Sequence, residues 1–182
     1  MLPTCWKWDN ALSDDLIELF LKDVSNSQLQ KGTLLHDGVT GKLDEVVRKN
    51  DVVIYPAYHF LAGTLLNYAM IANHAARWNR DLKGVDCVQY AQYGVDEFYD
   101  WHVDTKMLTS DPFHRKLTVV CLLNDPSEFE GGLLELDLVQ EQPILGKGSV
   151  IVFPSHVRHR VTPVTKGIRK TATSWIMGPT TW

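Results

Sequence analysis

The chain has 182 residues, of which 45% are hydrophobic and 22% charged, so it is long enough for one well-buried core and short for two. Its formal net charge of −4 gives no electrostatic reason to expect a nucleic-acid partner. The three cysteines, Cys5, Cys87 and Cys121, form no C-x-x-C pair, which argues against a disulfide framework and a structural zinc site. No apolar stretch is long enough for a membrane span and residues 1–10 show no signal-peptide pattern, so we expect one cytoplasmic domain over residues 1–182.

Helical patterns come first along the chain. Residues 11–25 place Leu16 and Phe20 at helical spacing, and Ser13 before two aspartates suits a helix N-terminus. The segment from Pro56 to residue 79 reads as a long helix opened by a proline in its first turn. We therefore expect residues 1–80 to be mainly helical support for the rest of the domain.

From residue 86 onward the pattern changes to short β-rich runs separated by Gly, Pro, Asn and Asp. The runs are VDCVQYAQY, KLTVVCLLND, GLLELDLV, GSVIVF, HRVTPV and RKTATSWIM. This spacing favours a sandwich or jelly roll with helices packed outside. The predicted fold is therefore mainly β with flanking helices (α+β), with a double-stranded β-helix (jelly-roll, cupin-like) core in residues 86–182.

The motif HVD lies where an extended run gives way to a polar loop. Side chains two apart on a strand point to the same face, so His102 and Asp104 project together and Val103 points away. Two groups that can bind a metal would then converge. A motif this short occurs by chance, so the prediction of a metal site requires a third ligand.

Two histidines follow the strand SVIVF. Pro154 and Ser155 interrupt that strand, and a second strand then turns His159 toward the same face as Val161. His156 falls in the connection and is expected to face solvent. Two histidines and one carboxylate with open positions describe the facial triad of non-haem Fe(II) oxygenases.

The segment of residues 164–169 has the pattern of a hairpin, and its loop length decides which way Arg169 faces. A three-residue loop with positive φ at Gly167 would pair His159 with Thr173 and turn Arg169 inward, with about 13 Å between the Cα atoms of His159 and Arg169. A two-residue loop would turn Arg169 outward. A buried guanidinium needs an anionic partner, and a cosubstrate carboxylate could supply it.

These features together resemble the 2-oxoglutarate and Fe(II)-dependent dioxygenases of the prolyl 4-hydroxylase superfamily. The resemblance includes HVD, the segment HRVTPVTKGIRKTATSW with Arg169 ten residues after His159, and the stretches QYGVDEFYDWHVD, FEGGLLELD and VVRKNDVVIYP. It runs from about residue 45 to the C-terminus. One departure is Leu122, which stands where some members place a tyrosine, so a second polar contact to the cosubstrate is expected to be missing.

The resemblance implies the site and its cofactors. His102, Asp104 and His159 would bind Fe(II), Arg169 would pair with the distal carboxylate of 2-oxoglutarate, and Tyr93 would line the cosubstrate pocket. The implied reaction uses O2 and 2-oxoglutarate to hydroxylate an unactivated C–H bond, with release of succinate and CO2 and with ascorbate as a further cofactor candidate. The target we expect is a prolyl residue in a peptide or protein.

The substrate side of the site is less defined by the sequence. Tyr99, Trp101 and Trp175 are candidates for a substrate wall, although aromatic residues on strands more often belong to the core. The polar loop of residues 105–114 is a candidate lid or peptide-binding loop.

Other functions stay open at this point. A free amino acid or another small molecule could replace the peptide, and a nucleic-acid demethylase is a further alternative, although RKTATSW lacks the second arginine typical of such enzymes. A non-redox cupin-type metal enzyme would not explain Arg169. A non-catalytic binding module would be expected to have lost a metal ligand, and none is missing. The sequence does not indicate whether the protein is a monomer or an oligomer.

Overall fold

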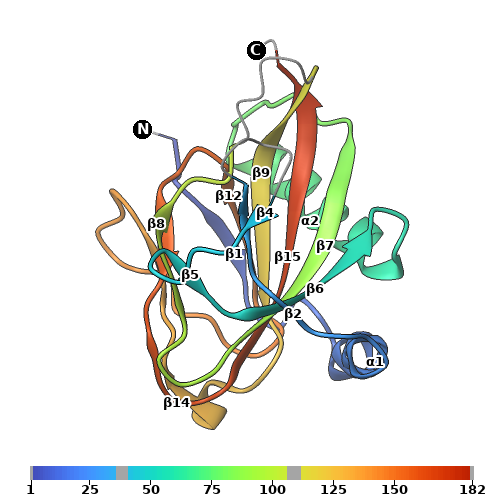
Figure 1. The fold of residues 1–182 in the computed structure, drawn as a ribbon. Helices are drawn as coiled ribbons and strands as arrows, with labels where there is room; N and C mark the ends of the chain where they lie inside the picture. Colours follow the sequence, from blue (N-terminus) through green and yellow to red (C-terminus); the bar gives the residue numbers. More distant parts are fainter. Residues whose placement is uncertain (1, 36–40, 106–111, 181–182) are drawn as a thin grey trace.

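A computed structural model describes residues 2–35, 41–105 and 112–180, and these residues form two facing antiparallel sheets (Figure 1). The major sheet has the strand order β1 (Trp6–Trp8), β12 (Val150–Pro154), β9 (Phe113–Leu122), β15 (Arg169–Pro179), β7 (Gly84–Tyr93), β6 (Asp51–Pro56) and β2 (Gln30–Lys31). The minor sheet has the order β11 (Leu134–Leu136), β13 (His159–Val161), β8 (Phe98–His102) and β5 (Arg48–Lys49).

Two short ladders and one helical turn complete the strand layers in the described residues. β10 (Phe129–Gly131) pairs with β14 (Val164–Gly167), and β3 (Leu34–Leu35) pairs with β4 (Gly41–Lys42). A short 3-10 helix, η1 (Pro126–Glu128), precedes β10. The jelly-roll prediction is confirmed by this arrangement.

One face of the major sheet is apolar and packs against the helices, and the other face borders the space between the two sheets. On β15, Ala172 and Ile176 belong to the cluster that packs against the helices, whereas Arg169, Thr171 and Thr173 point to the opposite face. This split follows from the two-residue period of a strand. The helix side therefore carries the largest core cluster, and the inner side carries two smaller apolar clusters together with polar groups.

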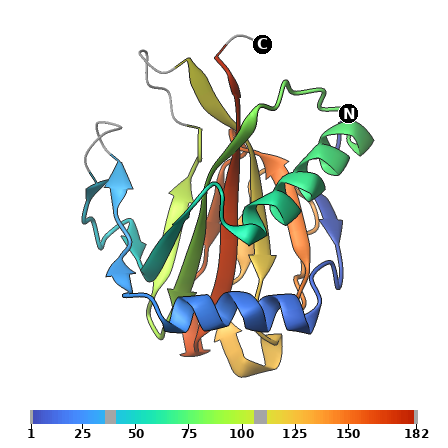
Figure 2. The ribbon, with the colours of Figure 1, turned by 90° about the vertical axis from the view of Figure 1, so that its right-hand side faces the viewer.

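The helices α1 (Asp14–Ser25) and α2 (Phe60–Ala75) both lie on the same side of the major sheet, as Figure 2 shows. Ser13 caps α1 by accepting a hydrogen bond from the backbone N–H of Leu16. α1 buries Ile17 and Phe20. Neither helix nor any other in the described part of the chain is long and apolar enough to cross a membrane.

The predicted helix start at Pro56 is wrong. Pro56 is the last residue of β6, and α2 begins at Phe60 with His59 as its N-cap. β2 pairs only with Asp51 and Val52 of β6, so no ladder hydrogen bond is needed from Pro56 on that side. Residues 1–80 therefore supply not only helical support, as expected, but also strands of both sheets.

The predicted hairpin across residues 164–169 is also wrong in its partner strands. Gly167 does have positive φ, 73°, and a side chain there would collide with the backbone carbonyl of Glu128. However, β14 pairs with β10, while β13 and β15 lie in different sheets. His159 and Arg169 therefore reach the space between the sheets from opposite sheets and do not lie on paired strands.

The contact between α1 and the major sheet yields a stability prediction. Phe20 is fully buried and lies edge-on to the rings of Tyr55 and Tyr90. Phe20→Ala should lower the free energy of unfolding by about 3–5 kcal/mol because it leaves a cavity. The adjacent Leu19 is 51% exposed, so Leu19→Ala should change it by no more than about 0.5 kcal/mol. Urea denaturation of both variants would measure this, and equal losses would contradict the placement of α1.

Candidate active site

A pocket of about 410 Å³, open space at its mouth included, lies between the two sheets. The major sheet contributes side chains from β7, β9 and β15, and the minor sheet contributes side chains from β8, β11 and β13, with Asp104 directly after β8. The lining residues are Gln89, Tyr93, Tyr99, His102, Asp104, Thr118, Val120, Leu134, His159, Val161, Arg169, Thr171 and Thr173. The lining is therefore mostly polar, with Val120, Leu134 and Val161 as its apolar members.

Three potential metal ligands converge in this pocket. One donor atom from each of His102, Asp104 and His159 lies within 4.8 Å of the others. Nε2 of His102 is 3.7 Å from Oδ1 of Asp104, and Nε2 of His159 is 3.4 Å from Oδ2. Two imidazoles and one carboxylate on one side of a cavity fit a divalent metal with positions left open for other ligands.

Backbone carbonyls fix the orientation of both imidazoles. Nδ1 of His102 lies 2.7 Å from the carbonyl oxygen of Asp100, and Nδ1 of His159 lies 3.0 Å from that of Val157. A carbonyl only accepts, so each Nδ1 carries the proton and donates it. Each Nε2 is then free to bind a metal, which is the usual arrangement of metal-binding histidines.

An irregularity in β8 sets which side chains reach the pocket. Tyr99 and His102 are three residues apart on β8 but face Val161 and His159, which are two apart on β13. The extra residue is a bulge, and bulges re-aim side chains near active sites. As a result Tyr99 and His102 share one face, with parallel rings whose centroids are 3.5 Å apart.

Burial and charge set the protonation of the triad. Burial, with the neighbouring His159, lowers the pKa of His102 to about 4, so its imidazole is neutral at pH 7. Burial alone would raise the pKa of the Asp104 carboxyl, but His159, His102 and Arg115 outweigh it and hold that pKa well below its ordinary value. Burial opposes the charged form of His159, yet Asp104 raises the pKa of His159 overall. The pocket therefore holds an ionised carboxylate.

Arg169 enters the pocket from the start of β15. Its side chain is buried, with 3% of the residue exposed, and its Cζ is 5.6 Å from the centroid of the Tyr93 ring. No carboxylate in the described part of the chain pairs with it. Gly132 makes room for this arginine, because a Cβ at position 132 would lie 2.8 Å from Cδ of Arg169. An unpaired buried guanidinium is costly, so the pocket favours an anionic ligand here.

A second buried arginine, Arg48, contacts residues that line the pocket, although it was not identified from the sequence. Arg48 donates hydrogen bonds to Asn50, to the backbone carbonyl of Thr33 and to Oε1 of Gln89. Its Cζ also lies 4.7 Å from the centroid of the Tyr99 ring. Arg48 thereby fixes two lining residues, Gln89 and Tyr99. The only sequence signal for this role was the stretch VVRKNDVVIYP, which gave no individual residue.

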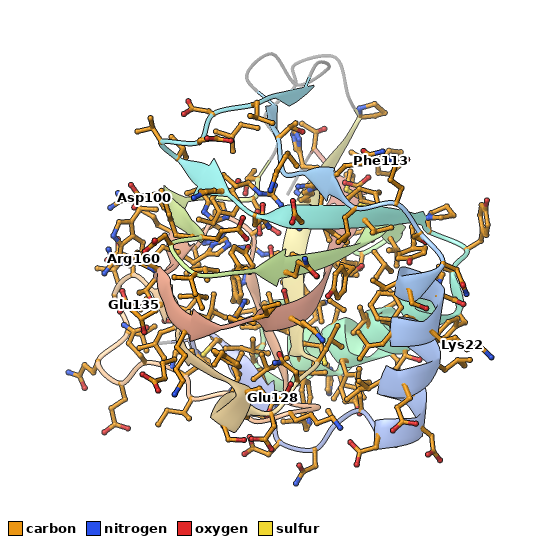
Figure 3. The ribbon with its side chains drawn as sticks, turned by 60° about the horizontal axis from the view of Figure 1, so that its bottom comes forward. Lys22, Asp100, Phe113, Glu128, Glu135 and Arg160 are labelled. Atoms are coloured by element: carbon orange, nitrogen blue, oxygen red, sulfur yellow. The ribbon has the colours of Figure 1, made fainter. Side chains whose placement is uncertain are left out.

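The three aromatic candidates for a substrate wall have different positions. Tyr99 lines the pocket. Trp101 does not, and instead packs beside Arg158 and Arg160, at 4.8 Å from Cζ of Arg160. Arg160 also pairs with Glu135, and Figure 3 shows these two side chains next to each other at the surface of the minor sheet. The bulge in β8 explains why Tyr99 and Trp101 separate although they are two residues apart.

Trp175 is buried on β15 opposite Thr118 and does not line the pocket, and Cζ of Arg115 lies 3.8 Å from its ring centroid. Leu122 is buried opposite Thr171, and of these two residues only Thr171 lines the pocket. His156 is exposed, as expected for a residue in the connection. Most of the candidate lid, residues 106–111, lies outside the described residues.

Comparison with known proteins identifies the family. The sequence profile of the 2OG-Fe(II) oxygenase superfamily matches residues 88–177, which include all three triad residues and Arg169. A PKHD-type hydroxylase of Thermosynechococcus vestitus is 30% identical over 158 residues, which span 83% of this chain and 70% of that protein. This chain belongs to the 2OG-Fe(II) oxygenase superfamily. The resemblance found in the sequence is therefore confirmed, and with it Fe(II), 2-oxoglutarate and O2 as the cofactor and cosubstrates of this oxidoreductase.

Solved structures support the same fold. The viral collagen prolyl hydroxylase from Paramecium Bursaria Chlorella virus-1, in its complex with 2OG, has a TM-score of 0.74 at 18% identity, with 97% of each chain covered. A prolyl hydroxylase from Trichoplax adhaerens, in complex with a hypoxia inducible factor peptide fragment, has a TM-score of 0.67 at 16% identity, with 95% of this chain and 83% of that chain covered. At these identities the similarity concerns the fold.

The convergence of the triad yields a prediction on metal binding. His102→Ala, Asp104→Ala and His159→Ala should each greatly weaken binding of Mn(II), because each removes one of three ligands. His156→Ala should leave binding nearly unchanged, since His156 is exposed and three residues from His159. Isothermal titration calorimetry under anaerobic conditions would measure the affinities. Loss of binding in His156→Ala with retention in His159→Ala would show that the third ligand is misassigned.

Proposed function

We propose that this oxygenase hydroxylates a prolyl residue in a peptide or protein, with His102, Asp104 and His159 as the iron ligands and Arg169 as the cosubstrate anchor. The observation that carries the proposal is the pairing of two features in one pocket. A convergent triad lies at one end, and a buried guanidinium without a carboxylate partner among the described residues lies in the same cavity. A dicarboxylate such as 2-oxoglutarate can reach both.

Different residues of the pocket would bind the cosubstrate and the metal. Arg169 would hold the distal carboxylate through two parallel hydrogen bonds, and Tyr93 would line the same end of the cosubstrate site. The iron, when bound, would supply the oxidising chemistry with O2 and 2-oxoglutarate and leave succinate and CO2. The triad takes one side of the metal, so the remaining positions stay available to the cosubstrates.

The apolar side chains of the lining would exclude water from the site. Val120, Leu134 and Val161 come from three different strands and flank the polar groups of the pocket. Side chains of this kind exclude water from a reacting centre, which limits side reactions. Tyr99, held by Arg48, would form the wall next to His102. These residues orient the target carbon and do not take part in the oxidation itself.

A peptidyl proline is the favoured substrate because of what is known of similar proteins. The Trichoplax adhaerens protein of the same fold is a prolyl hydroxylase and was solved with a peptide fragment, and the viral protein is a collagen prolyl hydroxylase. Free amino acids and other small molecules are the alternative within the same chemistry. The expected cytoplasmic location, the absence of a nucleic-acid partner and a lid at residues 105–114 stay predictions.

The experiment that tests the substrate class is a turnover assay. The Fe(II)-loaded enzyme would be given 2-oxoglutarate, O2 and a panel of proline-containing peptides, free amino acids and nucleic-acid oligomers. Mass spectrometry would then locate a mass gain of one oxygen atom. Succinate formation coupled to hydroxylation of a peptidyl proline is the expected result. Coupled turnover with free amino acids or oligomers alone would contradict the proposal.

The role given to Arg169 predicts a separable defect. Arg169→Ala should raise the KM for 2-oxoglutarate by about ten- to a hundredfold, because a charge-assisted hydrogen bond contributes about 1.5–3 kcal/mol. Mn(II) binding should be retained, since Arg169 is not a ligand. Arg169→Lys should fall between, because an ammonium keeps the charge but loses the planar fork. Initial-rate kinetics at varied 2-oxoglutarate would measure this, and an unchanged KM in Arg169→Ala would refute the assignment.

A further inference from the structure

Each carboxylate oxygen of Asp104 faces one histidine, with Oδ1 3.7 Å from Nε2 of His102 and Oδ2 3.4 Å from Nε2 of His159, but only Oδ2 also accepts a hydrogen bond from Thr118. We propose that the hydroxyl of Thr118, oriented by Ser155, occupies Oδ2 of Asp104 and thereby makes Asp104 a one-oxygen ligand of the metal. The inference rests on the proposed function, because it takes Asp104 as an iron ligand. It assigns a positioning role to two residues outside the triad.

The contacts form a short chain of hydroxyls behind the carboxylate. Oγ1 of Thr118 donates to Oδ2 of Asp104 at 2.8 Å, and Oγ of Ser155 lies 3.1 Å from Oγ1 of Thr118. Thr118 and Ser155 are both fully buried. An ionised carboxylate only accepts, so the single proton of Thr118 goes to Asp104 and Ser155 must donate to Thr118. The direction of both hydrogen bonds is therefore fixed.

Rigid backbone holds this chain of hydroxyls in place. Thr118 lies in β9, an interior strand of the major sheet, opposite Phe153 on one side and Trp175 on the other. The carbonyl oxygen of Ser155 accepts from the backbone N–H groups of Asp104 at 2.9 Å and Thr105 at 3.2 Å. The same residue thus fixes the backbone of the ligand and, through Thr118, its carboxylate. Little freedom is left for the carboxylate to rotate.

The consequence concerns the open positions on the metal. A carboxylate that binds through both oxygens takes two coordination positions, whereas one that binds through Oδ1 alone takes one. With two histidines, an Asp104 that bound through both oxygens would leave fewer positions for the cosubstrates than an Asp104 that bound through one. The hydrogen bond from Thr118 would compete with a bound metal for Oδ2 and so favour binding through Oδ1 alone.

The test compares hydroxyl variants of nearly equal size. Thr118→Val removes the donor and keeps the volume, and Thr118→Ser restores a hydroxyl. Ser174→Ala is the control, because Ser174 is a buried hydroxyl on β15 that bonds to the carbonyl of Cys87 on the side of the sheet away from the pocket. The probe is Mn(II), with affinity measured by calorimetry and bound water counted from EPR line broadening in 17O-enriched water.

Thr118→Val should weaken Mn(II) binding by about ten- to a hundredfold, as expected when the hydrogen-bond partner of a metal ligand is lost. It should also hold one exchangeable water fewer than the wild-type chain, because the second oxygen of Asp104 is released to the metal. Thr118→Ser and Ser174→Ala should keep the wild-type water count. Ser155→Ala should shift affinity in the same direction as Thr118→Val but less, since it removes only the orienting donor.

Two results would overturn the inference. One is a Thr118→Val variant with wild-type affinity or the wild-type water count, and the other is a Thr118→Ser variant that behaves like Thr118→Val. Failure of the proposed function would look different, because the wild-type chain would then bind Mn(II) no better than His102→Ala. Wild-type binding that depends on His102 but not on Thr118 would leave the metal site intact and remove only the role of the hydroxyl.

Discussion

The buried ionised carboxylate of Asp104 is the constraint on which the inner face of the sandwich depends. A charge removed from water must be compensated by charged or hydrogen-bonding neighbours. Here two imidazoles face it from the minor sheet, and a hydroxyl of the major sheet donates to it. The carboxylate therefore ties the two sheets together at the point where the chemistry takes place, and the same groups that stabilise it leave its surroundings suited to a cation.

A second electrostatic requirement acts at the other part of the pocket. Arg169 and Arg48 are both buried, and the hydrogen bonds of Arg48 go to neutral oxygens. Arg169 lines the pocket and Arg48 lies behind the lining residues Gln89 and Tyr99, whereas Asp104 is the acidic residue of the lining. Such a separation of charge attracts a ligand that is anionic at one end and able to coordinate a metal at the other.

Much of this arrangement could be predicted from the sequence, and the errors have physical causes. The two-residue period placed His102 with Asp104 and His159 with Val161, because alternation in a strand depends only on local geometry. The pairing of β14 with β10 was missed because sequence does not reveal which distant strand completes a ladder. The bulge in β8 was missed for a related reason, since it becomes visible only when two strands are compared. Arg169 was expected to face inward from a register that does not exist, so its position in the pocket rests on the structure.

The residues that support the ligands were the hardest to find. Thr118 and Ser155 are small polar residues within or next to apolar strands, and such residues are common in any β-sandwich. Their role depends on three segments that meet only in the folded state, β9, the end of β8 and the turn after β12. The role of Gly132 was equally hard to predict, because this glycine matters only for the space that it leaves to the side chain of Arg169.

The strand order of the major sheet has a consequence for how the protein is made. β15 follows all the other described strands in sequence, yet it lies between β9 and β7 near the middle of the sheet. During synthesis the N-terminal strands β6 and β7 and the later strands β9 and β12 can form only two separate halves, each with an unpaired edge. Residues 169–179 join the halves, so cooperative folding of the major sheet must wait until this segment has left the ribosome. Until then the nascent chain exposes strand edges that chaperones would need to protect.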